Sequence, residues 1–175
     1  MPLEFRHLTS NDIPLMQALL TTFGEAFNET DTYAAKRPSA GYLRRLLDSN
    51  SFIALAALQN SIVAGGIAAY ELQKFEQERS EIYIYDLAVA VAHRRKGIAT
   101  ALIEELKKIA AGRGAYVIFV QADTGVEDKA AVELYTKLGT REDVLHFDIA
   151  VVGNSAAQQG VGPLKVFPLS DKGKV

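Results

Sequence analysis

The chain has 175 residues and a mass of 19.0 kDa, with 49% hydrophobic and 23% charged residues, which is the composition of one ordinary globular domain. Its apolar stretches are short, whereas a membrane-spanning helix needs about 20 consecutive apolar residues. The lack of cysteine excludes disulfides, thiolate zinc sites and a catalytic thiol, and a net charge of −2 disfavours nucleic-acid binding. The N-terminus carries acids and no apolar run, so we expect a cytoplasmic protein without a secretory signal.

The first half of the chain predicts a strand, two helices and a β-hairpin. Ser10–Asp12 supply capping residues for the first helix, which runs to about Phe27, and Ser39 caps the second. A turn at 59–61 joins two runs rich in Ala, Val and Ile. The predicted order is a strand at 3–7, the two helices separated by a polar loop at 28–38, and hairpin strands at 52–58 and 62–72.

The second half predicts the strongest strand and the longest helix. Aromatic and β-branched residues alternate over 81–91, and apolar residues then recur at helical spacing from Ile98 until Gly112 and Gly114. The run 115–121 has the length and apolar character of a buried parallel strand. A helix from about Asp128 to Leu138 and a closing strand at 144–149 complete the order β-α-α-β-β-β-α-β-α-β. We interpret residues 1–150 as one domain and 151–175, rich in Gly, Ser, Ala and Gln, as a flexible tail.

The sharpest chemical signal is the segment Arg94-Arg95-Lys96-Gly97-Ile98-Ala99, between a strand and a helix N-terminus. The first backbone N–H groups of a helix have no intrahelical partner, and the helix dipole adds positive potential, so such a place binds phosphate. Gly97 lets an anion approach closely, and the basic side chains add charge-assisted contacts. The segment is neither a Walker A loop nor a Rossmann fingerprint. It predicts a pyrophosphate site, with a solvated basic turn as the alternative.

This loop and the element order resemble the GNAT superfamily of acetyl-CoA-dependent N-acetyltransferases, whose pyrophosphate loop reads Q/R-x-x-G-x-G/A. Arg94, Gly97 and Ala99 fill the defined positions, and the resemblance covers residues 3–150. Runs such as AAYELQKFEQERSEIYIYDLAVA, HRRKGIATALI and AVELYTKLGTRE look like aminoglycoside 3-N-acetyltransferases of the type I group. The resemblance implies an α/β GNAT fold, with a mostly antiparallel mixed sheet and a splayed parallel pair. It implies acetyl transfer, by direct amine attack, to the 3-amino group of deoxystreptamine antibiotics such as gentamicin, and hence resistance.

The same resemblance assigns the cofactor side of the site. In this family the strand matching 81–91 carries a bulge, splays from the next strand and pairs its backbone with the pantetheine arm. Tyr135, in the pattern A-x-x-x-Y-x-x-x-G, matches the tyrosine that protonates the departing thiolate, a reasonable acid with a pKa of about 10. The alternative for Tyr135 is a half-buried helix residue. The implied acetyl-CoA-binding residues are Leu87, Ala88, Val89, Arg94, Arg95, Lys96, Gly97, Ile98, Ala99 and Thr100.

Asp86 is an acidic residue within a predicted apolar strand, so its presence there needs a structural or chemical explanation. An ionised carboxylate in a dry interior costs several kcal/mol unless it is paired or its pKa shifts. Strict alternation places Asp86 on the face of Ile82 and Ile84, and a bulge would exchange the faces beyond it. Asp86 is a candidate general base or ammonium ligand, and the alternative is a structural hydrogen bond to a neighbouring loop.

The acceptor side should carry carboxylates, because an aminoglycoside has several ammonium groups. Between Gln121 and Ala150 seven acids face three bases, which is either a solvated surface or a field that attracts a cation. Asp123 follows a predicted strand at the edge where ligands of α/β sheets gather, and the loop at 28–38, which contains Tyr33, can cover the cleft. The candidate substrate residues are Glu81, Tyr83, Tyr85, Asp123 and Asp143, with ordinary sheet packing as the alternative for the tyrosines.

Other interpretations stay open at this point. The same acids would attract a polyamine or a lysine-bearing peptide, and a non-catalytic acetyl-CoA sensor would keep the cofactor site without turnover. The three histidines, His7, His93 and His146, lack metal-ligand spacing, so we expect no metal site. We expect no nucleic-acid or membrane partner, and the family resemblance makes a homodimer a further option.

Overall fold

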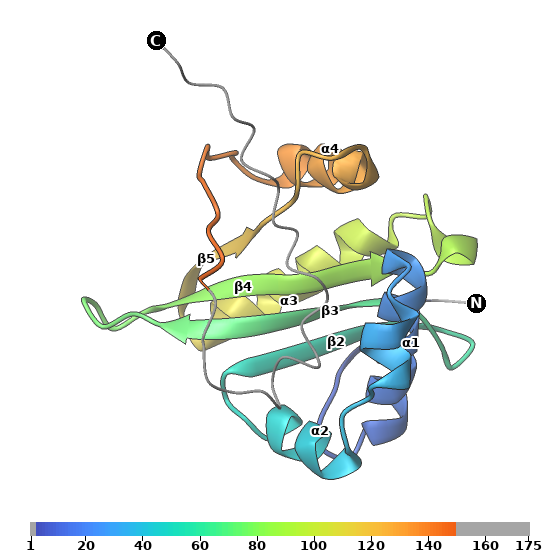
Figure 1. Ribbon diagram of the computed structural model, residues 1–175. Coiled ribbons are helices and arrows are strands. Elements are labelled where there is room, and N and C mark those ends of the chain that lie inside the picture. Colours follow the sequence, from blue (N-terminus) through green and yellow to red (C-terminus); the bar gives the residue numbers. More distant parts are fainter. Residues whose placement is uncertain (1–2, 150–175) are drawn as a thin grey trace. The chain divides into compact units, whose positions relative to one another are not determined.

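A five-stranded sheet is the framework of the protein, whose computed structural model describes residues 3–149. The chain divides into two compact units, Met1–Thr140 and Arg141–Val175, and the sheet belongs to the first. The strand order is β1-β2-β3-β4-β5, with β4 and β5 parallel and the other neighbours antiparallel (Figure 1). The strands are β1 Glu4–His7, β2 Phe52–Gln59, β3 Ile62–Gln73, β4 Ser80–Val89 and β5 Ala115–Val120. These bounds confirm the five corresponding predictions to within two residues.

The part of the chain from residue 3 to 149 also forms four α-helices. They are α1 Ile13–Phe27, α2 Ala40–Leu47, α3 Ile98–Arg113 and α4 Lys129–Leu138. Ser39 caps α2 as predicted, since its hydroxyl accepts the N–H of Tyr42 at 3.2 Å. The side-chain cap expected from Ser10–Asp12 is wrong. Asp12 occupies the N-cap position, but its carboxylate accepts the N–H and hydroxyl of Thr9 and pairs with Arg6 at 2.9 Å, so no side-chain oxygen caps α1.

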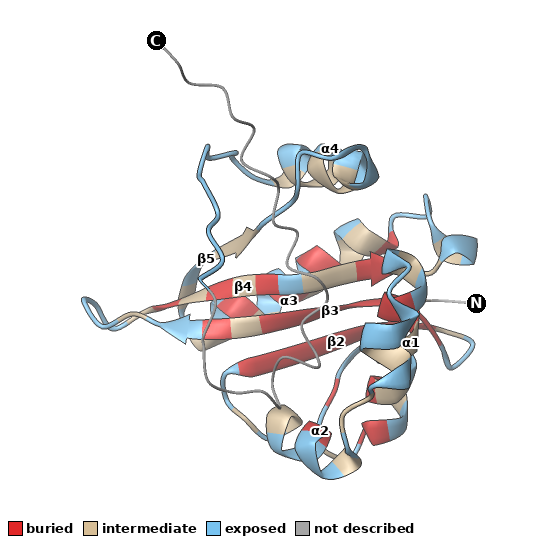
Figure 2. Cartoon of the chain, in the orientation of Figure 1, coloured by how far each residue is buried: buried red, intermediate tan, exposed pale blue. Residues whose placement is uncertain are grey.

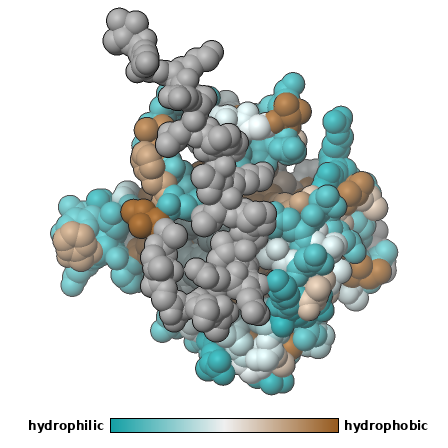
Figure 3. Space-filling model, viewed as in Figure 1, coloured by the Kyte–Doolittle hydropathy of each residue, from teal (hydrophilic) through white to brown (hydrophobic). Residues whose placement is uncertain are grey.

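The sheet has a core on each face. Helices α1 and α2 cover one face, and α3 covers the other (Figure 1). β2 is buried as far as Leu58, because its alternate residues enter the two cores (Figure 2). On α3 the buried positions are Ile98, Leu102, Ile103, Leu106 and Ala110, so the predicted helical period is confirmed. Hydrophilic side chains cover most of the described surface on the side of α1 and α2 (Figure 3).

A bulge divides β4 into two parts. Ala68 pairs with Asp86 and Ala69 with Ile84, so Tyr85 is the extra residue. Beyond it the faces exchange: Leu87 and Val89 join the core on the α3 side, as Ile82 and Ile84 do, and Ala88 joins the core on the α1 side. Strict alternation, which would place Asp86 with Ile82 and Ile84, is therefore wrong beyond Tyr85.

β4 also separates from β5 at the bulge. Their register runs from Ser80↔Ala115 to Ile84↔Val120 and ends there. Within the described residues, the stretch from Tyr85 to Val89 therefore pairs with β3 alone. Residues 80–84 are thus the paired half of β4, and residues 85–89 are its open half. In the open half, the backbone N–H and C=O groups that point away from β3 have no partner strand among the described residues.

The described part of the second unit is residues 141–149. The closing strand predicted at 144–149 is wrong, because this stretch forms no strand. Its apolar side chains alternate, but a strand also needs a ladder partner; the polar residues make local pairs instead, Arg141 with Asp143 at 2.9 Å and His146 with Asp148 at 3.0 Å. The tail predicted at 151–175 lies outside the described residues. No helix within 3–149 is long and apolar enough to cross a membrane.

Candidate active site

The carboxylate of Asp86 follows the β4 bulge directly. The hydroxyl of Tyr33, from the short π-helical turn Asp31–Ala35, donates a hydrogen bond to Asp86 Oδ2 at 3.0 Å. Asp86 thus makes the structural hydrogen bond to a neighbouring loop that the sequence offered as one interpretation. Burial raises the pKa of this carboxyl, and Glu29 raises it further, while the bond from Tyr33 acts in the opposite direction. Such a carboxyl is better matched to accepting a proton than an exposed one.

A row of aromatic rings crosses the sheet beside Asp86. Phe52, Tyr70, Tyr83 and Phe119 are direct register partners on four adjacent strands, and Tyr85 is inserted among them at the bulge. Neighbouring ring centroids lie 4.9–5.8 Å apart, within the range of favourable aromatic pairs. Tyr85 is 62% exposed. The row therefore offers a ring face and phenolic hydroxyls close to a carboxylate, which suits the C–H face of a sugar or an organic cation.

The open half of β4 presents main-chain groups away from β3. The Ala90 N–H donates to the Ala64 carbonyl at 2.9 Å, so Ala90 faces β3. Alternation then directs the N–H groups of Val89 and Leu87 to the other side, where β5 no longer pairs. The Val89 carbonyl on that side accepts a hydrogen bond from Arg94 Nε at 3.1 Å. An extended ligand can add to this edge through main-chain hydrogen bonds.

The loop before α3 is shaped for an anion. Gly97 has φ +77° and Arg95 φ +59°, and a Cβ built on Gly97 meets nothing within 4 Å. The N–H of Ala101 is the first to bond within the helix, to Gly97 O at 3.0 Å, and no side chain caps α3. The N–H groups of residues 98–100 are left at an open helix N-terminus, so these residues fit a pyrophosphate. Lys96 Nζ donates to the Ala92 carbonyl at 3.0 Å, which fixes the loop from within.

Tyr135 lies on α4, within the first unit. It is partly buried against the same core cluster that Leu87 and Val89 contact. Burial, with a smaller contribution from Asp128, raises the pKa of Tyr135 to about 12. Its phenol is therefore protonated at neutral pH, and it is a weaker proton donor than a tyrosine with the ordinary pKa.

Glu81, a predicted substrate residue, has other partners. It lies in the paired half of β4, accepts a hydrogen bond from the Tyr116 hydroxyl and pairs with Lys74 Nζ at 3.1 Å. The bond from Tyr116, followed by that from Lys74, lowers the pKa of Glu81. The structure therefore places Tyr83 and Tyr85 near Asp86, whereas Glu81 lies near the β3–β4 hairpin with other partners.

The other two predicted carboxylates lie in loops. The N–H of Asp123 donates to Asp128 Oδ2 at 2.8 Å, in the segment that follows β5. Two residues earlier, Gln121 Oε1 accepts the hydroxyl of Tyr83 at 3.0 Å, which ties the end of β5 to the aromatic row. Asp143 pairs with Arg141 in the second unit.

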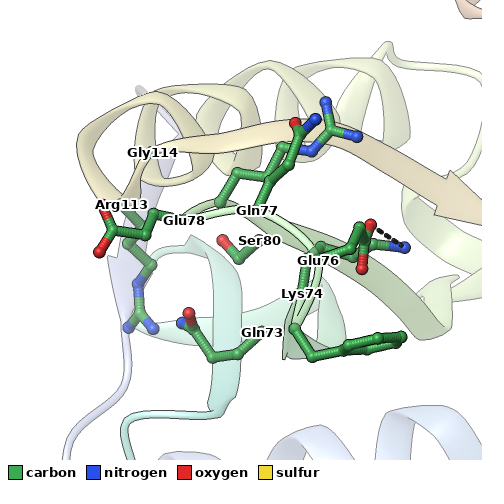
Figure 4. Close-up of a pocket in the computed structure, with 10 residues that line it drawn as sticks. Gln73, Lys74, Glu76, Gln77, Glu78, Ser80, Arg113 and Gly114 are labelled. Atoms are coloured by element: carbon green, nitrogen blue, oxygen red, sulfur yellow. Dashed lines mark ion pairs between the residues drawn. The ribbon is translucent and has the colours of Figure 1, made fainter.

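A hollow of about 580 Å³ lies elsewhere, at the β3–β4 hairpin (Figure 4). Lys74 and Glu76, both in its lining, form an ion pair at 3.3 Å. None of the residues predicted for catalysis or binding lines it in the described part of the chain. Its lining consists of Gln73, Lys74, Phe75, Glu76, Gln77, Glu78, Arg79, Ser80, Arg113 and Gly114. We therefore locate the candidate active site by its chemistry, at the open half of β4.

Sequence reasoning missed Tyr70 and Phe119 of the aromatic row and Gln121, which accepts the Tyr83 hydroxyl, and it gave Tyr33 no contact. Tyr33 is 53 residues from Asp86 in sequence. The only sequence signal for it was the polar loop expected to cover the cleft. Tyr70 and Phe119 follow from the register of the sheet, which composition does not reveal.

Comparison with known proteins identifies the family. The acetyltransferase (GNAT) family matches residues 14–140, a span that contains Asp86, the open half of β4, the loop before α3 and Tyr135. The chain belongs to this family. Its fold is therefore the GNAT fold, as the resemblance implied, and the protein is an acetyltransferase of the kind that uses acetyl-CoA.

Solved GNAT structures include close relatives. An aminoglycoside acetyltransferase from an uncultured soil metagenomic sample is 66% identical, with a TM-score of 0.85 over 86% of this chain and 99% of that chain. Another, from the same kind of source and in complex with sisomicin, is 30% identical, with a TM-score of 0.79 over 85% and 96% of the two chains. AAC(6')-Iy in complex with a CoA-containing bisubstrate analog is 14% identical, with a TM-score of 0.66 over 86% and 100%, and shows the fold alone. No curated protein matched the chain.

Proposed function

We propose that this GNAT protein is an aminoglycoside N-acetyltransferase, which transfers the acetyl group of acetyl-CoA to the 3-amino group of deoxystreptamine antibiotics such as gentamicin. The observation that carries the proposal is the partly buried carboxylate of Asp86, beside an aromatic row and next to the open half of β4. The relatives solved as aminoglycoside acetyltransferases support the substrate class. The 3-position rests on the resemblance of the sequence to type I enzymes. The proposal keeps the cytoplasmic location expected from the sequence.

The cosubstrate side of the proposal uses groups at the edge of β4 and the start of α3. Acetyl-CoA supplies the acetyl thioester. Its pyrophosphate would be held by Gly97 and the N–H groups of residues 98–100, with Arg95 and Lys96 adding positive charge. The main chain of Leu87 and Val89 would pair with the pantetheine arm, and the Val89 N–H is the proposed donor to the thioester carbonyl.

The proton transfers fall to two side chains. The acceptor amine arrives largely as an ammonium ion, and Asp86 accepts its proton directly or through one water. The neutral nitrogen then forms a bond to the acetyl carbon, the carbon–sulfur bond breaks, and the nitrogen, which now carries the acetyl group, loses its second proton to solvent. Tyr135, which is protonated at neutral pH, gives its proton to the departing sulfur and regains one from solvent, and Asp86 later releases its own proton to solvent. The products are an amide and a free thiol.

The acceptor would lie along the aromatic row. Tyr83 and Tyr85 are the proposed contacts for an amino-sugar ring, since their rings are 5.8 Å apart and Tyr85 is exposed. Ammonium groups are attracted to aromatic faces as well as to carboxylates. Asp123 is proposed as a carboxylate for another ammonium group, while Asp143, predicted from the sequence for the same role, lies in the second unit. We leave Glu81 out of this set, because Lys74 already neutralises it.

The test is free-thiol release from acetyl-CoA with four acceptors in parallel: gentamicin, its 3-amine-blocked analogue, spermidine and a lysine peptide. We expect turnover of gentamicin and none of the blocked analogue. Turnover of both would keep the substrate class and refute the 3-position. Reaction of spermidine or peptide alone would overturn the antibiotic assignment, and acetyl-CoA binding without reaction of any amine would favour a sensor.

A further inference from the structure

Tyr33 is held rigidly for a residue in a connecting loop. Its ring packs on Phe23 and Phe27 of α1, with centroid distances of 6.1 and 5.8 Å. A Cβ added to Gly24 would lie 3.1 Å from the Tyr33 Cβ, so a glycine on α1 makes room for this turn. From this anchored ring the hydroxyl reaches Asp86 Oδ2 at 3.0 Å. The contact joins the turn between the first two helices to the residue that follows the bulge.

The surroundings of Asp86 leave one oxygen for another partner. The titratable groups that face this carboxylate are Tyr33 and Glu29 from the loop and Tyr70, Tyr83 and Tyr85 from the sheet. Within residues 3–149, Asp86 forms no ion pair, and its only side-chain hydrogen bond is that to Oδ2. The hydrogen bond to Oδ2 fixes the orientation of the carboxylate, and Oδ1 can then accept a hydrogen bond from a bound ligand.

We infer that Tyr33 is a positioning residue, which holds Oδ2 of Asp86 so that Oδ1 faces the acceptor amine. The inference rests on the proposed function, because it takes Asp86 to be the base. Tyr33 touches neither the donor nor the bond that forms. Its effect comes through orientation and through the hydrogen bond that it donates to the ionised carboxylate.

Removal of the Tyr33 hydroxyl should change the pKa of Asp86 in a defined direction. The bond from Tyr33 favours the charged form of Asp86, while burial and Glu29 favour the neutral form. Without the bond only the opposing influences remain, so the pKa of Asp86 rises and the carboxylate is protonated at a higher pH. In Tyr33→Phe, the acid limb of kcat/KM should therefore move to higher pH. We expect kcat/KM for the aminoglycoside to fall about three- to tenfold near neutral pH, and further below it.

The experiment compares four variants with the wild-type chain across pH, with gentamicin as acceptor: Tyr33→Phe, Tyr116→Phe, Asp86→Asn and the double variant Tyr33→Phe/Asp86→Asn. Tyr33→Phe keeps the packed ring and removes only the hydroxyl. Tyr116→Phe is the matched control, because it removes a tyrosine–carboxylate bond at the other end of β4. The double variant Tyr33→Phe/Asp86→Asn tests whether Tyr33 acts through Asp86, and in that background the tyrosine change should have no further effect.

A second measurement does not depend on turnover. A carbon-detected NMR titration follows the Asp86 carboxyl directly, with Asp86→Asn identifying its signal. We expect the midpoint to rise in Tyr33→Phe and to stay unchanged in Tyr116→Phe. An unchanged midpoint and an unchanged acid limb in Tyr33→Phe would overturn the inference. If the wild-type chain acetylates no aminoglycoside, the proposed function fails, and the NMR titration still decides whether Tyr33 controls Asp86.

Discussion

Each half of β4 carries a carboxylate that is hydrogen-bonded to a tyrosine hydroxyl, but the surroundings of the two carboxylates differ. Glu81 and Asp86 each accept a hydrogen bond from a tyrosine hydroxyl, donated by Tyr116 and Tyr33 respectively. Glu81 lies where β4 is paired on both sides, and Lys74 lies 3.1 Å from it, so its pKa is lowered. Asp86 follows the bulge, is partly buried and forms no ion pair within the described residues, so its pKa is raised. The hydrogen bond is therefore not what distinguishes the two carboxylates.

The difference follows from the bulge at Tyr85. The extra residue turns Asp86 towards the α1 side of the sheet, and the strand loses β5 as a neighbour at the same point. One irregularity thus creates both a carboxyl with a raised pKa and a strand edge that β5 no longer pairs. Proton transfer should depend on Asp86 in the open half of β4, whereas a change at Glu81 in the paired half should affect mainly stability.

The largest effect should come from Asp86→Asn. The amide keeps the shape and still accepts the bond from Tyr33, but it cannot take a proton at neutral pH. We expect kcat/KM for the aminoglycoside to fall by about 10²–10⁴, the usual contribution of a general base. The Kd for acetyl-CoA, measured by calorimetry, should not change. A loss of less than fivefold would remove Asp86 as the base.

A smaller loss of rate should follow from Tyr135→Phe, on the donor side of the open half. The ring and its packing remain, while the proton for the leaving sulfur is lost. We expect kcat to fall by about 10–100-fold with little change in KM, because the phenol acts only as the thiolate departs. Steady-state kinetics measure both constants. An increase in KM at constant kcat would instead assign Tyr135 to binding.

Gly97→Glu should weaken binding of the donor, by about tenfold or more in Kd for acetyl-CoA. A side chain at φ +77° costs about 1–2 kcal/mol, and a carboxylate at the helix N-terminus opposes an anionic ligand. Gly114→Glu is the matched control at the other end of α3, since Gly114 also has a positive φ, of +74°, and nothing within 4 Å of an added Cβ. Equal Kd values for the two variants would show that strain, not the anion site, causes the loss.

The local features on which this comparison depends could be selected from the sequence. A single acidic residue within an apolar strand was enough to select Asp86, and the glycine and bases before α3 were enough to select its N-terminus. The partner of Asp86 could not be predicted, because Tyr33 lies in a polar loop 53 residues away and the contact depends on how α1 packs. Alternation also predicted a closing strand after α4, where residues 141–149 lack the ladder that a strand requires. Periodicity reports side-chain faces but not pairing partners.

Asp86→Asn should also change stability, and the sign depends on pH. Because the pKa of Asp86 is raised in the folded state, the folded chain binds more protons there than the unfolded chain. The free energy of unfolding therefore falls as pH rises from the unfolded pKa through the folded one. Asparagine avoids this penalty, so the Tm at pH 7 should rise by about 1–3 °C. The gain should vanish at acid pH, where calorimetry of both proteins serves as the control.

Glu81→Gln should give the smallest effect and the opposite sign. The pKa of Glu81 is lowered in the folded state, so its stabilising contribution is present above the unfolded pKa and is lost as pH falls through the folded one. The variant should therefore have a slightly lower Tm at pH 7, a difference that disappears on acidification, and its kcat/KM should stay within about threefold of wild type. Thermal scans at several pH values, beside those of Asp86→Asn, test the two signs together. A rise in Tm for Glu81→Gln at pH 7 would show that burial outweighs Lys74 and Tyr116, and the two ends of β4 would then differ in geometry but not in electrostatics.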